Sequence, residues 1–290
     1  MLGTMTALSS VIILLLIIRI AGTPLSLPYG LKPENSSLVV IGAHYFGFDS
    51  NEPKKFFNHV TGLPWQQTIL IEASPAIASK LADMVAKRNP TPMVPPEQVR
   101  VLNEGVISGA DHSGVPQSVD FFSLDDHELK LPWWASQIGS FNKNHIRKHF
   151  PQFGRYNVST LEGHIKTTKV QAKLLSEAIK GAGVGKVGVL IIDAEGLDCR
   201  IVASQDWGSD DACRWRPNLL YFERTHCSDE GYIEARRALL HAHACAPTAG
   251  RNYQSSYRIV SEKTDHDQNS VFALEPLTGW TQEAAAAKWF

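Results

Sequence analysis

One apolar run followed by two carboxylates constrains the fold of this chain more than any other stretch. In Val187–Ile192, five of the six residues are β-branched or leucine. This composition is typical of a strand buried on both faces of a parallel sheet. Asp193 and Glu195 follow at once, and ligands of open α/β sheets bind beyond the carboxyl ends of the strands. Both are therefore predicted catalytic residues; the alternative is that one of them only caps the helix beginning near Leu197.

Strand and helix patterns alternate along most of the chain. The alternation predicts βαβ units and a doubly wound α/β fold with a mostly parallel sheet. The last two strand patterns flank a polar turn, which predicts an antiparallel hairpin at the sheet edge. The expected strands are Leu38–Ile41, Thr68–Ile71, Val99–Ile107 (interrupted at Gly105), Val187–Ile192, Pro217–Phe222, Ser256–Val260 and Ser270–Leu274, and the expected helices are Glu52–Val60, Ile77–Arg88, Val170–Ile179, Leu197–Trp207 and Ser228–Ala244.

The chain divides into an N-terminal segment, a linker and one domain. With 290 residues and 43% hydrophobic composition, it can form one large core, which we assign to residues 37–290. Residues 23–36 contain three prolines and form the linker. Within residues 1–22, Val11–Ile18 is continuously apolar, which predicts a single N-terminal membrane anchor. A cleaved signal peptide with secretion is the alternative, although the segment lacks a basic start.

The compartment of the domain stays open at this point. Arg19 and Lys32 favour the cytoplasmic side, whereas the sequons at Asn35 and Asn157 would be used only in a lumen. The four cysteines form no CxxC pair, so they are either buried thiols or include a disulfide. A formal net charge of -1 gives no global attraction for nucleic acid, and no nucleic-acid partner is expected.

The least regular part of the chain is residues 109–160. It contains the pair Trp133-Trp134, the polar segment 136–141 and a basic run of His145, Arg147, Lys148 and His149. An insert at the ligand edge of a sheet often covers a substrate. The alternative is a solvated loop with two buried tryptophans.

Two strand ends indicate a cofactor of the adenosine type. The first strand leads into Gly42-Ala43-His44-Tyr-Phe-Gly47, where glycines let the backbone approach a ligand closely. The second strand ends in Glu72, the position where a doubly wound fold places an acid against ribose hydroxyls. The loop is neither GxGxxG nor a P-loop, which disfavours nicotinamide and nucleoside triphosphate binding.

These segments together resemble the FkbM-type methyltransferases, a family of S-adenosylmethionine-dependent O-methyltransferases. The resemblance covers about Leu38–Leu274. Its most specific parts are Ile192-Asp-Ala-Glu-Gly-Leu-Asp198 and Arg216-Pro-Asn-Leu-Leu-Tyr-Phe-Glu223, with weaker parts at Ile71-Glu-Ala-Ser-Pro75 and Asn103-Glu-Gly-Val-Ile-Ser108.

The resemblance implies a Rossmann-like class I methyltransferase fold with a seven-stranded sheet whose last strand is antiparallel. It implies S-adenosyl-L-methionine as cofactor and a hydroxyl group of a small molecule, glycan or glycolipid as acceptor. Asp193 and Glu195 would act as base or orienter, with Glu223 and His226 as second choices. The residues that it implies for cofactor binding are Gly42, Ala43, His44, Gly47, Glu72, Asn103 and Gly105.

Other classes of function remain as alternatives. Val40 stands where the family usually has an aspartate, which supports a non-catalytic protein with the same fold. A nicotinamide-dependent oxidoreductase is the less favoured alternative. No metal is expected. His241, His243 and Cys245 lie close together in the sequence, but only His241 and Cys245 share a face of the predicted helix, whereas zinc usually takes four ligands.

Overall fold

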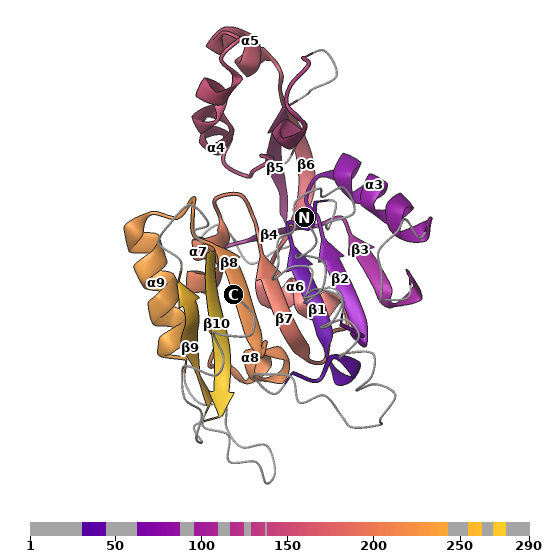
Figure 1. Ribbon diagram of the computed structural model, residues 1–290, viewed down its shortest axis with the longest axis vertical. Helices are drawn as coiled ribbons and strands as arrows, with labels where there is room; N and C mark the ends of the chain where they lie inside the picture. The colour runs from indigo at the N-terminus through magenta and orange to yellow at the C-terminus, as the bar shows by residue number, and fades with distance from the viewer. Residues whose placement is uncertain are drawn as a thin grey trace, which may run out of the picture.

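Two β-sheets with helices packed around them form the structure, a computed structural model (Figure 1). The larger sheet has the order β3-β2-β1-β7-β8-β10-β9, and its first five strands run parallel. These strands are β3 (Val99–Leu102), β2 (Gln67–Ile71), β1 (Ser37–Ile41), β7 (Val187–Ile192), β8 (Leu219–Glu223), β10 (Asn269–Pro276) and β9 (Ser255–Glu262). The structure describes residues 31–44, 63–87, 96–109, 117–124, 129–136, 138–242, 255–262 and 269–276.

The prediction of an α/β chain with a mostly parallel sheet is confirmed. The predicted C-terminal hairpin is also present, because β10 pairs antiparallel with both β8 and β9, and β9 forms the edge. The expectation of a single sheet is wrong, since β4 (Gly105–Ile107), β5 (Gln117–Leu124) and β6 (Ile165–Leu174) form a second sheet in the order β4-β6-β5.

Helices cover both faces of the larger sheet. Side chains alternate across each strand, so the apolar strands present apolar side chains to both faces. From β1, Val39 and Ile41 face a cluster that includes α6, α7, α8 and α9. Leu38 and Val40 face the opposite cluster, to which α3 contributes Leu81. These helices are α3 (Pro75–Ala86), α6 (Leu175–Gly181), α7 (Asp198–Ser204), α8 (Asp210–Trp215) and α9 (Asp229–Leu240), and short 3₁₀ turns lie at η2 (Pro33–Asn35) and η3 (Pro96–Gln98).

The second sheet corrects two predictions. The expected helix Val170–Ile179 begins only at Leu175, because its first half continues β6 and pairs with β5. Val170 and Ala172 are buried while Lys169 and Gln171 are exposed, which is the two-residue period of a strand. The expected strand Val99–Ile107 divides into β3 and β4, which belong to different sheets.

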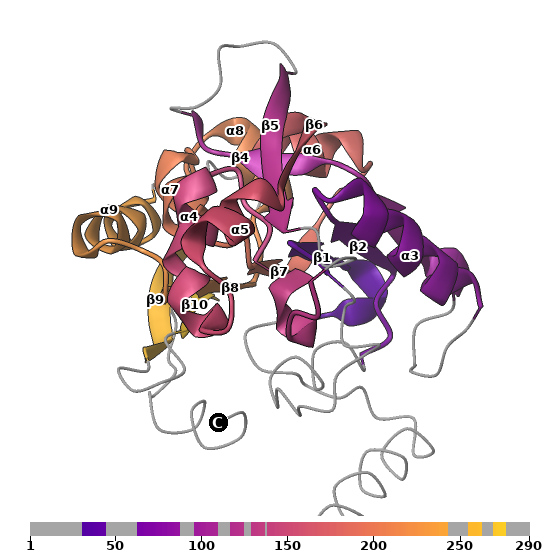
Figure 2. The same ribbon diagram turned by 90° about the horizontal axis from the view of Figure 1, so that it is seen from above.

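The irregular insert packs as a small unit with its own core. Its elements are η5 (Trp133–Ser136), α4 (Lys143–Lys148), η6 (Phe150–Phe153) and α5 (Val158–Gly163). Ile146, Phe150 and Leu161 are among the side chains that form this core. The insert lies beyond the carboxyl ends of the parallel strands, at the top of Figure 1 and toward the viewer in Figure 2. It therefore covers the edge where the ligand is expected.

A disulfide joins Cys199 of α7 to Cys227, with a Cα–Cα distance of 5.9 Å. Cys213 is disulfide-bonded as well, and no described cysteine is free. This decides the question left open by the sequence in favour of disulfides. The described helices include none that is long and apolar enough to cross a membrane. The predicted anchor, the predicted helix Glu52–Val60 and Gly47 lie outside the described residues.

Candidate functional site

The candidate site lies where the loops after β1, β2, β7 and β8 meet. The parallel register sets Ile41 beside Ile71 on one side and beside Ile192 on the other. Because these three residues end their strands, the loops that follow emerge at one edge of the sheet. Ile192 is paired in turn with Phe222, which precedes Glu223. The sheet thus brings the predicted cofactor loop and the predicted carboxylates together.

Glu72 is a buried acid held by the backbone of two loops. Its two carboxylate oxygens accept hydrogen bonds from His44 N at 2.9 Å and from Ser74 N at 2.7 Å. Burial raises the pKa of Glu72 from 4.5 to about 7, and the charge of Asp193 adds to this effect, whereas both hydrogen bonds oppose it. Asn103 lies beside it and donates from Nδ2 to the backbone oxygen of Glu72 at 2.9 Å.

The loop after β7 is shaped by Asp198, at the start of α7. Its carboxylate oxygens accept hydrogen bonds from Ala194 N at 2.9 Å and Gly196 N at 3.2 Å. Burial raises the pKa of Asp198 well above its ordinary value, and the charge of Asp193 raises it further. Asp198 therefore holds the backbone of the loop that carries Asp193 and Glu195.

The charge of Asp193 acts on several titratable groups at this edge of the sheet. Its charge raises the pKa of Glu72 and of Asp198, after burial, and acts against the burial-driven lowering of the pKa of His226. Asp193 is half-buried, so it is open to solvent in part. Its charge thus acts both on the predicted cofactor acid Glu72 and on His226.

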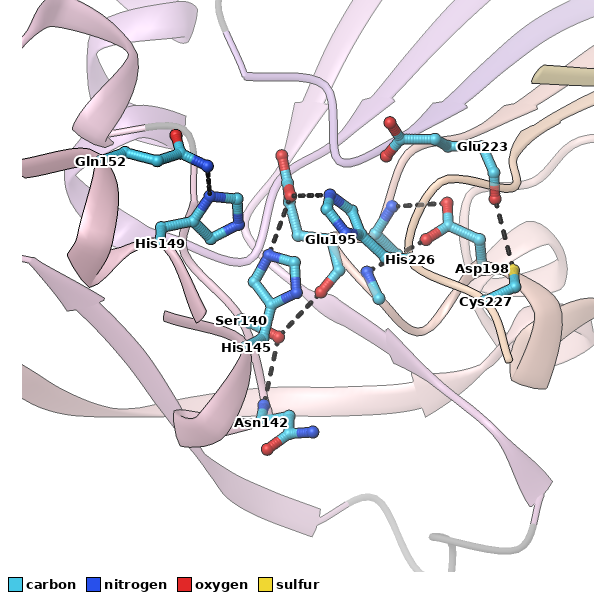
Figure 3. A network of polar contacts seen from close by, with 12 residues as sticks. Ser140, Asn142, His145, His149, Gln152, Glu195, Asp198, Glu223, His226 and Cys227 are labelled. Atoms are coloured by element: carbon cyan, nitrogen blue, oxygen red, sulfur yellow. Dashed lines mark hydrogen bonds and ion pairs between the residues drawn. The ribbon is translucent and has the colours of Figure 1, made fainter. Parts of the chain in front are cut away.

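Glu195 reaches toward the insert, where three histidines converge (Figure 3). Its Oε2 lies 3.1 Å from Nε2 of His145 and 3.8 Å from Nε2 of His226. The ring centroids of His145 and His226 are 4.6 Å apart, and that of His149 lies 5.0 Å and 5.6 Å from them. A second arrangement brings Glu195, Glu223 and His226 within reach of one ion.

Burial keeps all three imidazoles neutral near pH 7. It lowers the pKa of His145 to about 3, with help from the charges of His226 and His149. Burial is also the main cause that lowers the pKa of His149 and of His226. Neutral imidazoles can accept a proton or ligate a metal ion.

The structure brings together most of the predicted site residues. Gly42, Ala43, His44, Glu72 and Asn103 lie at the ends of β1, β2 and β3, and Asp193, Glu195, Glu223 and His226 at the ends of β7 and β8. Gly105 follows Asn103 by two residues, at the start of β4, and packs under the ring of Phe141, where a Cβ would lie 2.3 Å from Cζ.

Sequence reasoning did not predict His145 and His149 as site residues. It noted both in a basic run, but their spacing of four residues, which sets two side chains on one face of a helix, was the informative signal. Their approach to Glu195 and His226 depends on the fold of the insert, which no local pattern specifies. Comparison with known protein families, with curated proteins and with solved structures finds no match to this chain.

Proposed function

We propose that this protein is an S-adenosylmethionine-dependent O-methyltransferase of the FkbM type. The observation that carries the proposal is the placement of a glycine-containing loop, the buried Glu72 and Asn103 at adjacent strand ends. In doubly wound folds an acid at the end of the second strand binds ribose hydroxyls. The Glu72 carboxylate is oriented by His44 N, within the loop that would face the methionine part of the cofactor. These residues fit an adenosine-type cofactor.

The strand order adds support from the fold. The antiparallel β10 lies between β8 and the edge strand β9, at the end of a sheet whose other strands are parallel. A seven-stranded class I methyltransferase sheet with a reversed last strand is what the sequence resemblance implies. The separate sheet of β4, β5 and β6 would then be an addition that carries the insert.

The proposed reaction gives separate tasks to the protein's own residues. When bound, S-adenosylmethionine supplies an electrophilic methyl group on a sulfonium sulfur. The protein must hold the acceptor hydroxyl about 3 Å from that carbon and take up its proton as the new carbon–oxygen bond forms. Asp193 is our candidate for proton acceptor, because its charge acts on both Glu72 and His226 and its side chain is partly open to solvent. Glu195 is already engaged by two imidazoles.

Calorimetry with S-adenosylhomocysteine tests the proposal on the full-length protein. We expect one molecule to bind per chain and NAD to give no heat of binding. Glu72→Ala should weaken binding by about 1.5–3 kcal/mol, the usual value of hydrogen bonds to a charged group. Glu97→Ala, which changes an exposed glutamate, should bind like the wild type. Equal affinity in the Glu72 variant would remove this residue from the cofactor site.

A non-catalytic protein of the same fold is the second candidate. Val40 is only 1% exposed and packs in the core, so its position offers no polar group to a cofactor. If the full-length protein bound neither S-adenosylmethionine nor its demethylated product, this second candidate would be favoured.

We further propose that the domain folds in the secretory pathway, tethered by its N-terminal segment, with a signal peptide and secretion as the alternative. The Cys199–Cys227 disulfide and the disulfide at Cys213 support an oxidising compartment. The exposed sequon residue Asn157 fits the same compartment.

A further inference from the structure

Four side chains from three separate segments converge beside the candidate catalytic loop. His145 and His149 come from α4 and its C-terminal end, Glu195 from the loop after β7, and His226 from the loop after β8 (Figure 3). The three histidines each offer a ring nitrogen, and these atoms all lie within 4.8 Å of one another. Three imidazoles and one carboxylate form a nitrogen and oxygen donor set that suits zinc.

The separations are close to those of a tetrahedral zinc site. Zinc binds histidine nitrogen at about 2.0–2.1 Å, so tetrahedral ligand atoms lie roughly 3.3 Å apart. The Oε2 atom of Glu195 lies 3.1 Å from Nε2 of His145 and 3.8 Å from Nε2 of His226, on either side of that value. The three histidine nitrogens lie within 4.8 Å of one another, so they would approach by up to about 1.5 Å on binding zinc, which side-chain rotation allows.

His149 provides independent support for a bound ligand, because one of its ring nitrogens has no hydrogen-bond partner among the described residues. This nitrogen is Nε2, which is buried. Buried polar atoms in proteins normally have a hydrogen-bond partner, so a buried nitrogen without one is a candidate metal ligand. On the other side of the ring, Nδ1 of His149 contacts the side-chain amide of Gln152 at 3.3 Å. With the amide turned so that its oxygen accepts from Nδ1, Nε2 becomes free to ligate, as is usual for metal-bound histidine.

The backbone holds Glu195 in place for this role. Glu195 has φ of +47°, a left-handed conformation that is uncommon outside glycine and is found at functional sites. Its carbonyl oxygen accepts a hydrogen bond from Ser140 Oγ at 2.9 Å, and the next residue, Gly196, donates to Asp198. A Cβ on Gly196 would lie 3.0 Å from Nδ1 of His145, so this glycine lets the imidazole lie against the loop.

We propose that His145, His149, His226 and Glu195 bind one zinc ion, which fastens the insert to the loops after β7 and β8. A site with four protein ligands is closed and structural rather than open to substrate. The site concerns the cover of the sheet edge and does not depend on the identity of the cofactor.

Zinc binding by the full-length protein is the test. Chelator-treated protein should take up one zinc ion per chain with a dissociation constant below about 1 μM, as structural zinc sites do. His149→Ala and His226→Ala should each weaken binding by at least about 100-fold, since changes to outer partners alone cost 10–100-fold. Glu195→Gln keeps the shape of the side chain and should also weaken binding, and it serves if a histidine variant fails to fold.

The matched control is His241→Ala, which removes an exposed histidine from the end of α9. This variant should bind zinc like the wild type. Loss of binding in His241→Ala with full binding in the other variants would overturn the proposal in favour of the C-terminal histidines. A wild-type protein without stoichiometric zinc would overturn it as well.

Tryptic cleavage tests the fastening role. Arg147 and Lys148 are exposed on α4, between the two proposed ligands of the insert. Zinc should slow cleavage after these residues in the wild type and leave the rate in His226→Ala unchanged. Zinc uptake without slower tryptic cleavage would show that the bound ion does not hold the insert in place. Cofactor calorimetry is read separately, so failure of the zinc site and failure of the proposed methyltransferase are distinguishable.

Discussion

Gly42 packs directly against the backbone of Asp193. A Cβ built on Gly42 would lie 1.7 Å from the carbonyl oxygen of Asp193, and Gly42 has φ of +71°. Two strands of a parallel sheet end here side by side, since Ile41 pairs with Ile192 and Asp193 N donates to Ile41 O at 2.9 Å. The glycine therefore sets how closely the predicted cofactor loop and the predicted catalytic loop approach each other.

We expect Gly42→Ala to destabilise the protein and to disturb cofactor binding. Forcing atoms into a packed site costs about 1–3 kcal/mol, and the left-handed backbone adds about 1–2 kcal/mol. The free energy of unfolding, measured with denaturant, should fall by about 2–5 kcal/mol in total. Gly185→Ala is the matched control, because among the described residues no heavy atom beyond its chain neighbours lies within 4 Å of its Cβ position. Similar stability of both variants would contradict the close packing of Gly42.

Binding of S-adenosylhomocysteine should strengthen as the pH rises from 6 to 8. Burial raises the pKa of Glu72 to about 7, so this carboxyl is mostly protonated at pH 6 and mostly ionised at pH 8. Only the ionised form accepts hydrogen bonds from two hydroxyls with both oxygens. Linkage then predicts roughly tenfold tighter binding at pH 8 than at pH 6, with the gain levelling off above pH 7.

Calorimetry at several pH values measures this dependence. Glu72→Gln should bind more weakly and lose the pH dependence, whereas Glu97→Gln should keep it. An unchanged slope in Glu72→Gln would assign the pH dependence to another group.

The sequence predicted the parallel sheet because its strands carry their own signal. Val187–Ile192 is apolar throughout and is buried throughout. The pattern failed at Val170–Leu174, where apolar spacing looked helical but pairing with the distant Val119 region of β5 made a strand. Such non-local pairing overrides weak local propensity.

The site was predicted in part for the same reason. Asp193, Glu195 and Glu72 follow strong strands, so the rule that ligands bind at carboxyl ends located them. His145 and His149 lie in the insert, and their approach to Glu195 depends on how the second sheet carries that insert over the edge. Because this approach is set by tertiary folding, the four-residue spacing of His145 and His149 is the signal that the sequence itself carries.

Loss of the Cys199–Cys227 disulfide should destabilise the protein by about 3–4 kcal/mol. The two cysteines are 28 residues apart, and closing a loop of that length in the unfolded chain gives this value in the chain-entropy model. The double variant Cys199→Ala and Cys227→Ala, compared by denaturant unfolding with the oxidised wild type, measures the effect. Mass spectrometry after thiol alkylation should find no modification at either cysteine in the wild type; full modification of both would contradict the disulfide.

Asn157 should carry an N-linked glycan if the domain enters the secretory pathway. Asn157 is exposed, and its Oδ1 caps α5 by accepting a hydrogen bond from Thr160 N at 2.8 Å. Replacing Asn157 would remove the cap together with the sequon. Ser159→Ala removes the sequon and the hydrogen bond from Ser159 Oγ to Asn157 Oδ1 but keeps the capping residue, and Ser159→Thr keeps the sequon, the hydroxyl and the cap. A mass shift on glycosidase treatment should disappear in Ser159→Ala and persist in Ser159→Thr; no shift in the wild type would count against lumenal exposure of this site.

Asp193→Asn should separate catalysis from loop structure. The loop after β7 is held by Asp198, whose oxygens accept hydrogen bonds from Ala194 N and Gly196 N, so an amide at position 193 should leave the fold intact. If Asp193 takes the acceptor's proton, methyl transfer should fall by about 10²–10⁴-fold, the usual value of a positioned acid–base group. Transfer is measured from labelled S-adenosylmethionine to the glycan and lipid fractions of the expressing cells.

Asp198→Asn provides the contrasting variant for the same measurement. It removes one of two acceptors from the loop, so it should lower the free energy of unfolding by about 1–3 kcal/mol. Asp193→Asn should instead keep its melting temperature and its affinity for S-adenosylhomocysteine while losing transfer. A stable, cofactor-binding and fully active Asp193→Asn variant would exclude this carboxylate as the proton acceptor, and Glu223 would then be the next residue to replace, because it shares the same edge of the sheet.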